Sequence, residues 1–471
     1  MYIFDTLTKT KKKFTPIAPG KVGFYQCGPT MYWNQHIGNM RSVVLADFMN
    51  RSLQYLGNEV TFVRNYTDVG HLSGDNEGDA DTGIDRMEKA AKRDGKNPEE
   101  IFQYYKKLYE QDLSALNTLP PSVAPRATDH IQEMIEMVKT LLDKEYAYQT
   151  ERAIYFDISK KEDYTKLSGQ KLDELISGTG HGDVVDSDKK NAGDFSLWFF
   201  KTGTHEHALQ TWPNPFSETQ GFPGWHIECS AMSKKYLGET FDIHMGGIEH
   251  IPIHHTNEIA QSESTHGKDF VSYWIHNEHL LVDNKKMSKS EGTSYLVQDI
   301  VDKGYSPLDL RYFFMQAHYR SKQNFTWDAL ESSKQARSKL SSKIASYADS
   351  GSVSDMYKNE FKKALEADFS LPEALSVTYS VLSSDLSDSD KKATILDFDS
   401  VLGLKLEQAE HANDGEISYM NLPENIIALV DERLTARAEK DWARSDEIRD
   451  QLAELGYEVK DTAVEQKVFK K

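Results

Sequence analysis

A strand–helix–strand pattern near the start of the chain constrains the fold more than any other feature. The apolar run Val22–Gln26 is bounded by a Cys-Gly-Pro turn and predicts a short buried strand. From Asn39 onward, apolar residues recur at helical spacing and stop at Gly57, a residue well suited to end a helix. Because Glu59–Val63 supplies a second strand, the pattern predicts a parallel βαβ unit. Its ligand site should lie at the carboxyl end of the first strand, beside the helix N-terminus.

The quartet His36, Ile37, Gly38 and Asn39 falls at that predicted helix N-terminus. Exposed amides and the helix dipole attract phosphate there, Gly38 permits close backbone approach, and His36 can donate to a phosphate oxygen. The same four residues also fit an ordinary helix start in which Asn39 is the capping side chain. Both interpretations stay open on these residues alone.

A second candidate phosphate site is the loop Lys285–Thr293, which contains the run Lys-Met-Ser-Lys-Ser. Its two lysines, Lys286 and Lys289, can neutralise a polyphosphate and stabilise the charge that develops on a leaving pyrophosphate. Lysine-rich loops are also common on solvated surfaces, so the loop by itself does not decide between the two.

The chain has only two cysteines, Cys27 and Cys229. In a reducing cytosol a distant pair is more typical of a metal site, catalysis or an inert core than of a disulfide. His254 and Glu258 are four residues apart, so on a helix both side chains point from one face. Thiolate, imidazole and carboxylate form a ligand set that zinc accepts. Spacing alone also permits inert cysteines and an exposed His–Glu pair.

Leu422–Lys471 predicts a long helix followed by a strand-like Tyr457–Lys460. Cations are spaced four, three and four residues apart along this helix and would share one face. They are Arg433, Arg437, Lys440 and Arg444, with Trp442 beside them. Such a stripe can bind nucleic acid, with the aromatic stacked on a base. Acidic residues lie among the cations, so a solvated, salt-bridged helix is the alternative.

Composition limits the class of protein. At 471 residues the chain should form two or three domains with a sizeable core. A formal charge of −19 argues against a protein that coats nucleic acid indiscriminately, although it permits a local basic surface. With neither a long apolar run nor a charged-then-apolar leader, we expect a cytoplasmic protein without membrane association.

Taken together, the motifs resemble a known family. The quartet ending at Asn39 and the later Lys286–Ser290 run are the signature pair of class I aminoacyl-tRNA synthetases. The segments around Cys27 (CGPTMY), Cys229 (GWHIECSAMS) and His254 (HHTNEIAQS) resemble cysteinyl-tRNA synthetase. The resemblance extends from about Phe4 to the end of the chain.

This resemblance implies ATP-dependent ligation of L-cysteine to tRNA(Cys) through a cysteinyl-adenylate, by a monomer that uses ATP with Mg²⁺. One zinc ion would select the cysteine thiolate on Cys27, Cys229, His254 and Glu258. His36, Asn39, Lys286 and Lys289 would be catalytic, and His36, Gly38, Asn39 and Lys289 would bind ATP. Gly28, Thr67, Trp225 and His244 match the cysteine pocket. Arg433, Arg437, Lys440, Trp442 and Arg444 would contact tRNA.

The implied fold is α/β, with a Rossmann-like parallel-sheet catalytic domain split by an insertion, then a helical bundle and a small α/β C-terminal domain. The catalytic halves would span 1–118 and 221–296, around a connective insertion at 119–220. A stem-contact-like helical region at 297–345, an anticodon-binding bundle at 346–412 and a C-terminal anticodon-recognition domain at 413–471 would follow.

Two rival functions remain open. The cysteine ligase of mycothiol biosynthesis shares the zinc and adenylation chemistry but transfers cysteine to an amino sugar, and it does not need an anticodon reader. A relative that has lost catalysis is the second rival. Its best support is Asn39, since the family's quartet more often ends in His, while the intact His36, Lys286 and Lys289 speak against it. Gly70 and His71 are a further departure, because many family members carry acidic residues there. Glu249 stands where the family carries an Asp.

Overall fold

The structure is a computed structural model of the chain, and it describes residues 1–69, 86–177, 189–288, 292–408, 422–438, 441–461 and 466–470. Gly70, His71, Lys289 and Lys440 therefore lie outside the described residues. The chain divides into two compact units. The catalytic unit comprises Met1–Arg337 and Ala348–Lys405, and the C-terminal unit comprises Ser338–Tyr347 and Leu406–Lys471.

Four parallel strands form the central sheet of the catalytic unit, in the order β10, β9, β3, β4. They are β3 (Lys21–Gln26), β4 (Glu59–Arg64), β9 (Phe241–Gly247) and β10 (Val271–Asn277). Helix α1 (Ile37–Tyr55) connects β3 to its parallel neighbour β4, which confirms the predicted βαβ unit. The strand order reverses between β3 and β9. The carboxyl ends of these two strands therefore form the crevice where open parallel sheets bind ligands.

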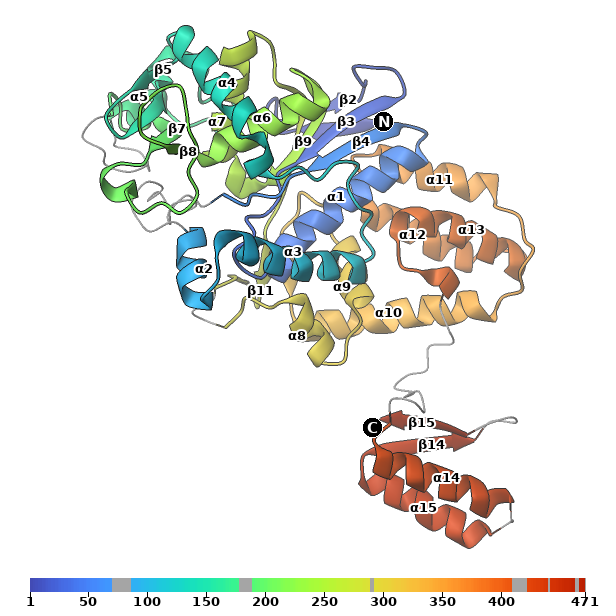
Figure 1. Cartoon of the computed structure of the whole chain (residues 1–471). Coiled ribbons are helices and arrows are strands. Elements are labelled where there is room, and N and C mark those ends of the chain that lie inside the picture. Colours follow the sequence, from blue (N-terminus) through green and yellow to red (C-terminus); the bar gives the residue numbers. More distant parts are fainter. Residues whose placement is uncertain are drawn as a thin grey trace. The chain divides into compact units, whose positions relative to one another are not determined.

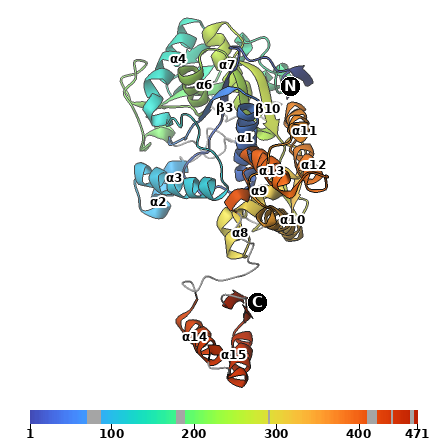
Figure 2. The same cartoon turned by 90° about the vertical axis from the view of Figure 1, so that its right-hand side faces the viewer.

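Helices lie on opposite sides of this sheet (Figures 1 and 2). Helix α1 covers one side, while α6 (Trp225–Leu237) and α7 (His254–His266) cover the other and pack on each other and on α4 (Ile131–Asp143). Buried apolar side chains of the strands and of these three helices form one core cluster. Removing this apolar surface from water stabilises the arrangement and fixes the strand ends.

An antiparallel sheet lies between β4 and β9 in the chain, with strands in the order β5, β6, β7, β8. The strands are β5 (Ala147–Gln149), β6 (Ala153–Phe156), β7 (Phe195–Phe200) and β8 (Gly221–Pro223). The predicted strand 195–200 is confirmed. The predicted strand from Ala153 to Ile158 ends earlier, at Phe156, because the Asp157 side chain accepts from Ser159 N and starts a short 3₁₀ turn.

A small sheet carries the lysine loop. Strand β11 (Leu280–Val282) pairs in parallel with β13 (Gln323–Phe325) and antiparallel with β12 (Lys285–Lys286). The turn between β11 and β12 is Asp283 and Asn284, and both adopt the left-handed conformation, with φ of 49° and 64°. Such a two-residue turn favours Asn and Asp, so the sequence suits this tight hairpin.

The remaining elements of the catalytic unit are mainly helical. They are β1 (Tyr2–Asp5), β2 (Thr10–Lys13), α2 (Arg86–Asp94), α3 (Pro98–Ala115), α5 (Leu172–Ser177), α8 (Val297–Asp302), α9 (Pro307–Met315), α11 (Asp355–Glu366), α12 (Leu371–Leu382) and α13 (Asp388–Leu402). Helix α10 (Trp327–Ser346) begins in this unit and ends in the C-terminal unit. Helices α11, α12 and α13 pack together as a bundle.

The C-terminal unit corrects one expectation. In place of one long helix it has α14 (Glu424–Ala438) and α15 (Trp442–Glu454), followed by an antiparallel pair, β14 (Tyr457–Asp461) and β15 (Gln466–Lys470). The break has a local cause, because the Asp441 side chain accepts from Arg444 N and caps a new helix. Apolar side chains of both helices and both strands form a separate core cluster.

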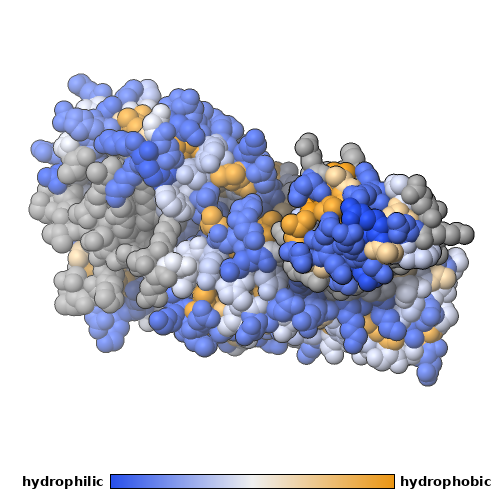
Figure 3. Space-filling model, turned by 90° about the horizontal axis from the view of Figure 1, so that it is seen from below, coloured by the Kyte–Doolittle hydropathy of each residue, from blue (hydrophilic) through white to orange (hydrophobic). Residues whose placement is uncertain are grey.

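Among the described residues, every helix is too short or too polar to cross a bilayer. Figure 3 shows one face of the molecule, on which hydrophilic residues predominate and hydrophobic ones are scattered in small groups.

Candidate active site

Cys27 directly follows β3, at the crevice between β3 and β9. Its backbone N–H donates to Met245 O on β9, at 3.4 Å. The next residue must be Gly28, because a Cβ there would lie 1.6 Å from Asn65 O at the end of β4. Gly28 N also donates to Asn65 Oδ1, at 2.8 Å. This close approach of two strand ends fixes the direction of the Cys27 side chain.

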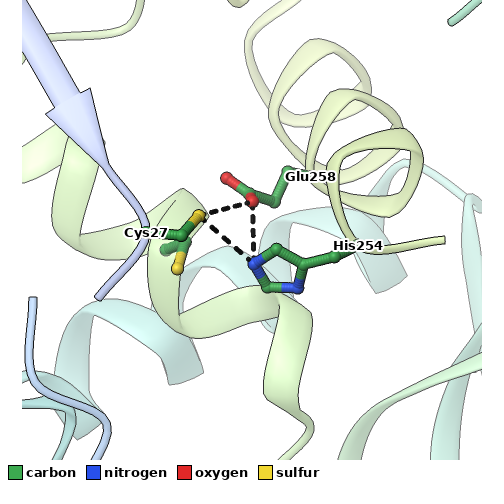
Figure 4. Close-up of side chains that lie close together, drawn as sticks. Cys27, His254 and Glu258 are labelled. Atoms are coloured by element: carbon green, nitrogen blue, oxygen red, sulfur yellow. Dashed lines mark hydrogen bonds and ion pairs between the residues drawn. The ribbon is translucent and has the colours of Figure 1, made fainter. Parts of the chain in front are cut away.

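His254 and Glu258 lie in the first turns of α7, one helical turn apart, as predicted. His254 Nε2 lies 2.9 Å from Glu258 Oε1. Cys27 Sγ lies 3.4 Å from each of these two atoms. Figure 4 shows the three side chains pointing toward one another from the strand end and from α7.

Cys229 completes the set from α6. Ligand atoms of Cys27, Cys229, His254 and Glu258 all lie within 4.8 Å of one another, and all but Cys27 are buried. The structure thus brings together the four residues proposed from sequence. Two sulfurs, one imidazole nitrogen and one carboxylate oxygen from three separate elements form a donor set that fits a tetrahedral zinc ion.

Burial and neighbouring charges shift the pKa of all four candidate ligands. Burial raises the pKa of the Cys27 thiol, whereas the hydrogen bond from Cys27 lowers the pKa of Cys229. Burial alone would lower the pKa of His254, but Glu258 and Cys229 raise it to about 10. Burial alone would raise the pKa of Glu258, but His244 and His254 lower it well below its usual value. Among the four, Glu258 is therefore anionic at neutral pH, and the shift of Cys229 is toward its thiolate form.

Neighbouring side chains orient these donors. His226 Nδ1 lies 2.9 Å from His254 Nδ1, so the His254 ring turns its Nε2 toward Cys27. The Trp225 ring stacks on His254, with centroids 4.3 Å apart. His244 Nε2 lies 2.8 Å from Glu258 Oε2. Such outer partners fix ring orientation and tune the ligands in metal sites.

The four residues expected at the cysteine pocket surround this cluster. Trp225 and His244 contact His254 and Glu258, as described above, and Gly28 follows Cys27. The buried Thr67 donates its hydroxyl to Glu228 Oε2, at 2.9 Å, next to Cys229. All four therefore border the candidate metal ligands or their chain neighbours.

Sequence reasoning missed two residues of this region. His255 Nε2 lies 3.5 Å from Cys27 Sγ, and Cys27, His244, His255 and Glu258 form a second, overlapping group of possible ligands. The buried Glu228 accepts from Thr67. Both residues are visible in the sequence as chain neighbours of predicted ligands, His255 of His254 and Glu228 of Cys229. Adjacent residues on a helix point in different directions, so helical spacing alone does not place either side chain in the site.

The quartet at residues 36–39 starts α1, but Asn39 is not its cap. His36 has extended backbone angles, and its Nδ1 accepts from Asn39 N at 3.2 Å, so His36 is the N-cap. The alternative of a capping Asn39 is therefore wrong. A neutral ring whose Nδ1 accepts carries its proton on Nε2, which suits donation to a phosphate oxygen.

The two signature segments lie against each other. A Cβ at Gly38 would lie 2.1 Å from Met287 Cε in the lysine loop, and Ile37 N donates to Tyr295 O at 2.8 Å. Ser288 N donates to Thr293 Oγ1, and Thr293 N to Ser288 O, which closes the base of the loop. Lys286 is exposed on β12.

The cations of the basic stripe that the structure describes, which exclude Lys440, do not share one helix face. Arg433 is 1% exposed and donates to Gln466 Oε1 on β15. Arg444 lies on the next helix and donates to Glu432 and Glu447. Arg437 lies beside Trp442, with its guanidinium 5.7 Å from the ring centroid, and Trp442 is 56% exposed. The expectation of one cationic helix face is wrong.

Comparisons with known proteins agree with this geometry. Residues 13–335 match the family model of the class I (C) tRNA synthetase catalytic domain, and residues 421–468 match the cysteinyl-tRNA ligase anticodon binding domain. The chain is 42% identical to cysteine–tRNA ligase 1 of Burkholderia lata, over 99% of this chain and 96% of that protein. It is 40% identical to cysteine–tRNA ligase of Treponema denticola, over 98% of each chain.

Solved structures show the same fold at low identity. A Mycobacterium tuberculosis methionyl-tRNA synthetase bound to methionyl-adenylate aligns with a TM-score of 0.54 and 13% identity, over 83% of this chain and 92% of that chain. The ternary LeuRS–tRNA–LeuAMS complex from Agrobacterium radiobacter K84 aligns with a TM-score of 0.59 and 10% identity, over 84% and 85%. The class I fold, the strand-end donor cluster and the full-length relatives together show that the chain belongs to the cysteinyl-tRNA synthetase family.

Proposed function

We propose that this protein ligates L-cysteine to tRNA(Cys) with ATP, through a cysteinyl-adenylate. The observation that carries the proposal is the cluster of Cys27, Cys229, His254 and Glu258 at the carboxyl end of β3, the strand that precedes α1 and its N-cap His36. The relatives that match this chain from end to end are cysteine–tRNA ligases. The separate C-terminal match, over residues 421–468, favours tRNA over an amino sugar as the acceptor.

In the first step, the carboxylate of cysteine attacks the α-phosphate of ATP in line, and pyrophosphate leaves. His36 would donate from Nε2 to a phosphate oxygen, and the amides of the first α1 turn would add the field of the helix N-terminus. Lys286 would stabilise the charge that develops on the leaving pyrophosphate, with Lys289 in the same role by family resemblance. Asn39, whose N–H already bonds His36, is proposed to reach phosphate through its amide side chain.

Zinc, when bound by the four donors, would take the thiolate of the substrate, which serine and alanine cannot supply. Thr67, Trp225, His244 and Gly28 would enclose the small side chain and exclude water. Packing alone separates such side chains by only about 1–3 kcal/mol, so thiolate selection would make a separate editing step unnecessary.

In the second step, a terminal ribose hydroxyl of tRNA attacks the carbonyl carbon of the mixed anhydride, the cysteinyl ester forms and AMP leaves. We assign the anticodon contact to the C-terminal unit, with Trp442 and Arg437 as the main candidates and Lys440 by resemblance. Arg433 and Arg444 are weaker candidates, because one is buried and the other bonds two carboxylates. The domain limits given by the resemblance, a cytoplasmic location and a monomeric state complete the proposal.

Purified protein tests the proposal in two assays. Labelled pyrophosphate should exchange into ATP only when cysteine is present, and serine should not replace it. The protein should then charge tRNA carrying the cysteine anticodon, and Cys229→Ser should lose both activities.

The rival functions give different results. Exchange followed by transfer to an amino sugar, with tRNA left uncharged, would identify the mycothiol-type ligase. Binding of zinc and ATP without any exchange would identify a relative that has lost catalysis.

A further inference from the structure

Arg41 is a fully buried arginine on α1, two residues after the signature quartet. Its Nε donates to Gln323 Oε1 and its Nη2 to Ser321 O, each at 3.1 Å, and its Nη1 donates to Glu278 O. These three acceptors are neutral oxygens. Burial lowers the pKa of the Arg41 guanidinium to about 10, although the negative charge of the Glu278 side chain opposes this shift. A buried cation is costly, so its retention calls for a specific geometric role.

The three acceptors lie where the chain enters β11 and β13, two strands of the sheet that carries the lysine loop. Glu278 lies between β10 and β11, while Ser321 and Gln323 lie at the start of β13. Strand β11 pairs with β13 on one side and with β12, which carries Lys286, on the other. Gln323 Nε2 also donates to Phe313 O at 2.6 Å, and Glu278 N to Tyr319 O at 2.9 Å. The acceptors are thus themselves held in place.

Helix α1 therefore contacts the lysine-loop region at two levels. At its first turn, Ile37 N donates to Tyr295 O, two residues after the loop, and Gly38 contacts Met287 within the loop. One turn further along the helix, Arg41 donates to residues at the starts of β11 and β13 in the same sheet. The helix that begins at His36 and the hairpin that carries Lys286 consequently form one structural block.

We propose that Arg41 is a positioning residue for adenylate formation, which fixes the Lys286 hairpin against the helix that begins at His36. This rests on the proposed function, in which both residues act on the phosphates of one ATP molecule. Arginine is required because its planar fork reaches acceptors on two separate segments at once. A lysine carries its three donors on one nitrogen, so it cannot reproduce bonds that Arg41 makes from three separate nitrogens.

The experiment compares Arg41→Lys with Arg311→Lys. Arg311 is a matched control, because it is also fully buried and donates to Leu116 O, Leu402 O and Asp47 Oδ2, away from the lysine loop. For Arg41→Lys, kcat/KM for ATP in cysteine-dependent exchange should fall by about 10–100-fold, since small misplacements of reacting groups cost this much. The KM for cysteine should not change.

Transfer of cysteine from preformed adenylate to tRNA should also proceed at the wild-type rate in Arg41→Lys, since pyrophosphate has already left. Arg311→Lys should lower the melting temperature without this ATP-specific loss. Equal losses in exchange and transfer, or an Arg41→Lys enzyme within twofold of wild type, would overturn the inference.

Hydrogen exchange gives a readout that does not depend on activity. Amides of residues 280–288 should exchange faster in Arg41→Lys than in wild type or Arg311→Lys. If the wild-type protein lacked cysteine-dependent exchange, the proposed function would fail, but this measurement would still decide whether Arg41 positions the hairpin. Unchanged protection of the hairpin would refute the positioning role.

Discussion

The structure brings together the candidate metal ligands of the catalytic unit, but it separates the basic residues of the C-terminal unit. The four candidate ligands come from a strand end and two helices far apart in the chain, yet their donor atoms meet within 4.8 Å. The four cations come from one short segment, and those that the structure describes are separated between a core, an ion-pair network and an aromatic contact. Proximity in sequence was therefore the poorer guide to a shared site.

The reason lies in what fixes each set. Cys27 is fixed by the carboxyl end of a buried strand, and His254 by the start of a helix on the neighbouring βαβ unit, so sheet topology brings them together. The stripe depended on one uninterrupted helix, and a single capping aspartate, Asp441, ends that continuity. A prediction that residues share one helix face holds only if the predicted helix boundaries are right.

The largest expected effect follows from removing a sulfur ligand. Cys229→Ser should reduce bound zinc from one ion per chain to almost none and lower cysteine-dependent exchange by at least about 100-fold, because a hydroxyl is a poor substitute for thiolate. Metal analysis and exchange assays measure this. Ser230→Ala, at the neighbouring buried position on α6, should keep its zinc. Full zinc content in Cys229→Ser would contradict the proposed ligand set.

Zinc binding should tighten as pH rises. His254, with a pKa raised to about 10, and Cys27, with a raised pKa, both hold protons in the metal-free cluster at neutral pH. Zinc binds only their deprotonated forms, so binding releases these protons and affinity gains about tenfold per pH unit for each. The His254 contribution should disappear above about pH 10. Calorimetry in buffers of different ionisation enthalpy counts the released protons, and zero release at pH 7–8 would disprove the protonation pattern.

In the C-terminal unit, Trp442→Ala should raise the KM for tRNA(Cys) by about 10-fold or more, because a stacked base contributes about 1–3 kcal/mol. Cysteine-dependent pyrophosphate exchange should stay at the wild-type rate, since the catalytic unit is unchanged. Leu434→Ala removes another exposed apolar side chain of the same unit and should leave the KM unaltered. An equal effect of both substitutions would indicate general destabilisation in place of tRNA contact.

The smallest effect should come from Arg444. Hydrogen bonds to Glu432 and Glu447 raise the pKa of its guanidinium and occupy its donors. Arg444→Gln should therefore change the KM for tRNA by less than about twofold, in keeping with the small contribution of exposed ion pairs. Arg437→Gln, beside Trp442, should have the larger effect. If the order were reversed, the predicted stripe would regain support as a tRNA-binding face.

The sequence by itself determined the βαβ unit, and it identified residues 36–39 and 286–290 as candidate phosphate sites and Cys27, Cys229, His254 and Glu258 as candidate metal ligands. These features depend on residue type and local periodicity, which are visible in one dimension. Only the tertiary structure decided that His36 caps α1 in place of Asn39, that Met287 lies on Gly38, and that Arg433 is buried. Each of these depends on which atoms approach across separate elements, and packing sets that choice. Only the tertiary structure showed that His255 lies beside the Cys27 thiol and that Arg41 bonds the backbone of Ser321. Neither spacing nor residue type indicates which groups a buried side chain contacts.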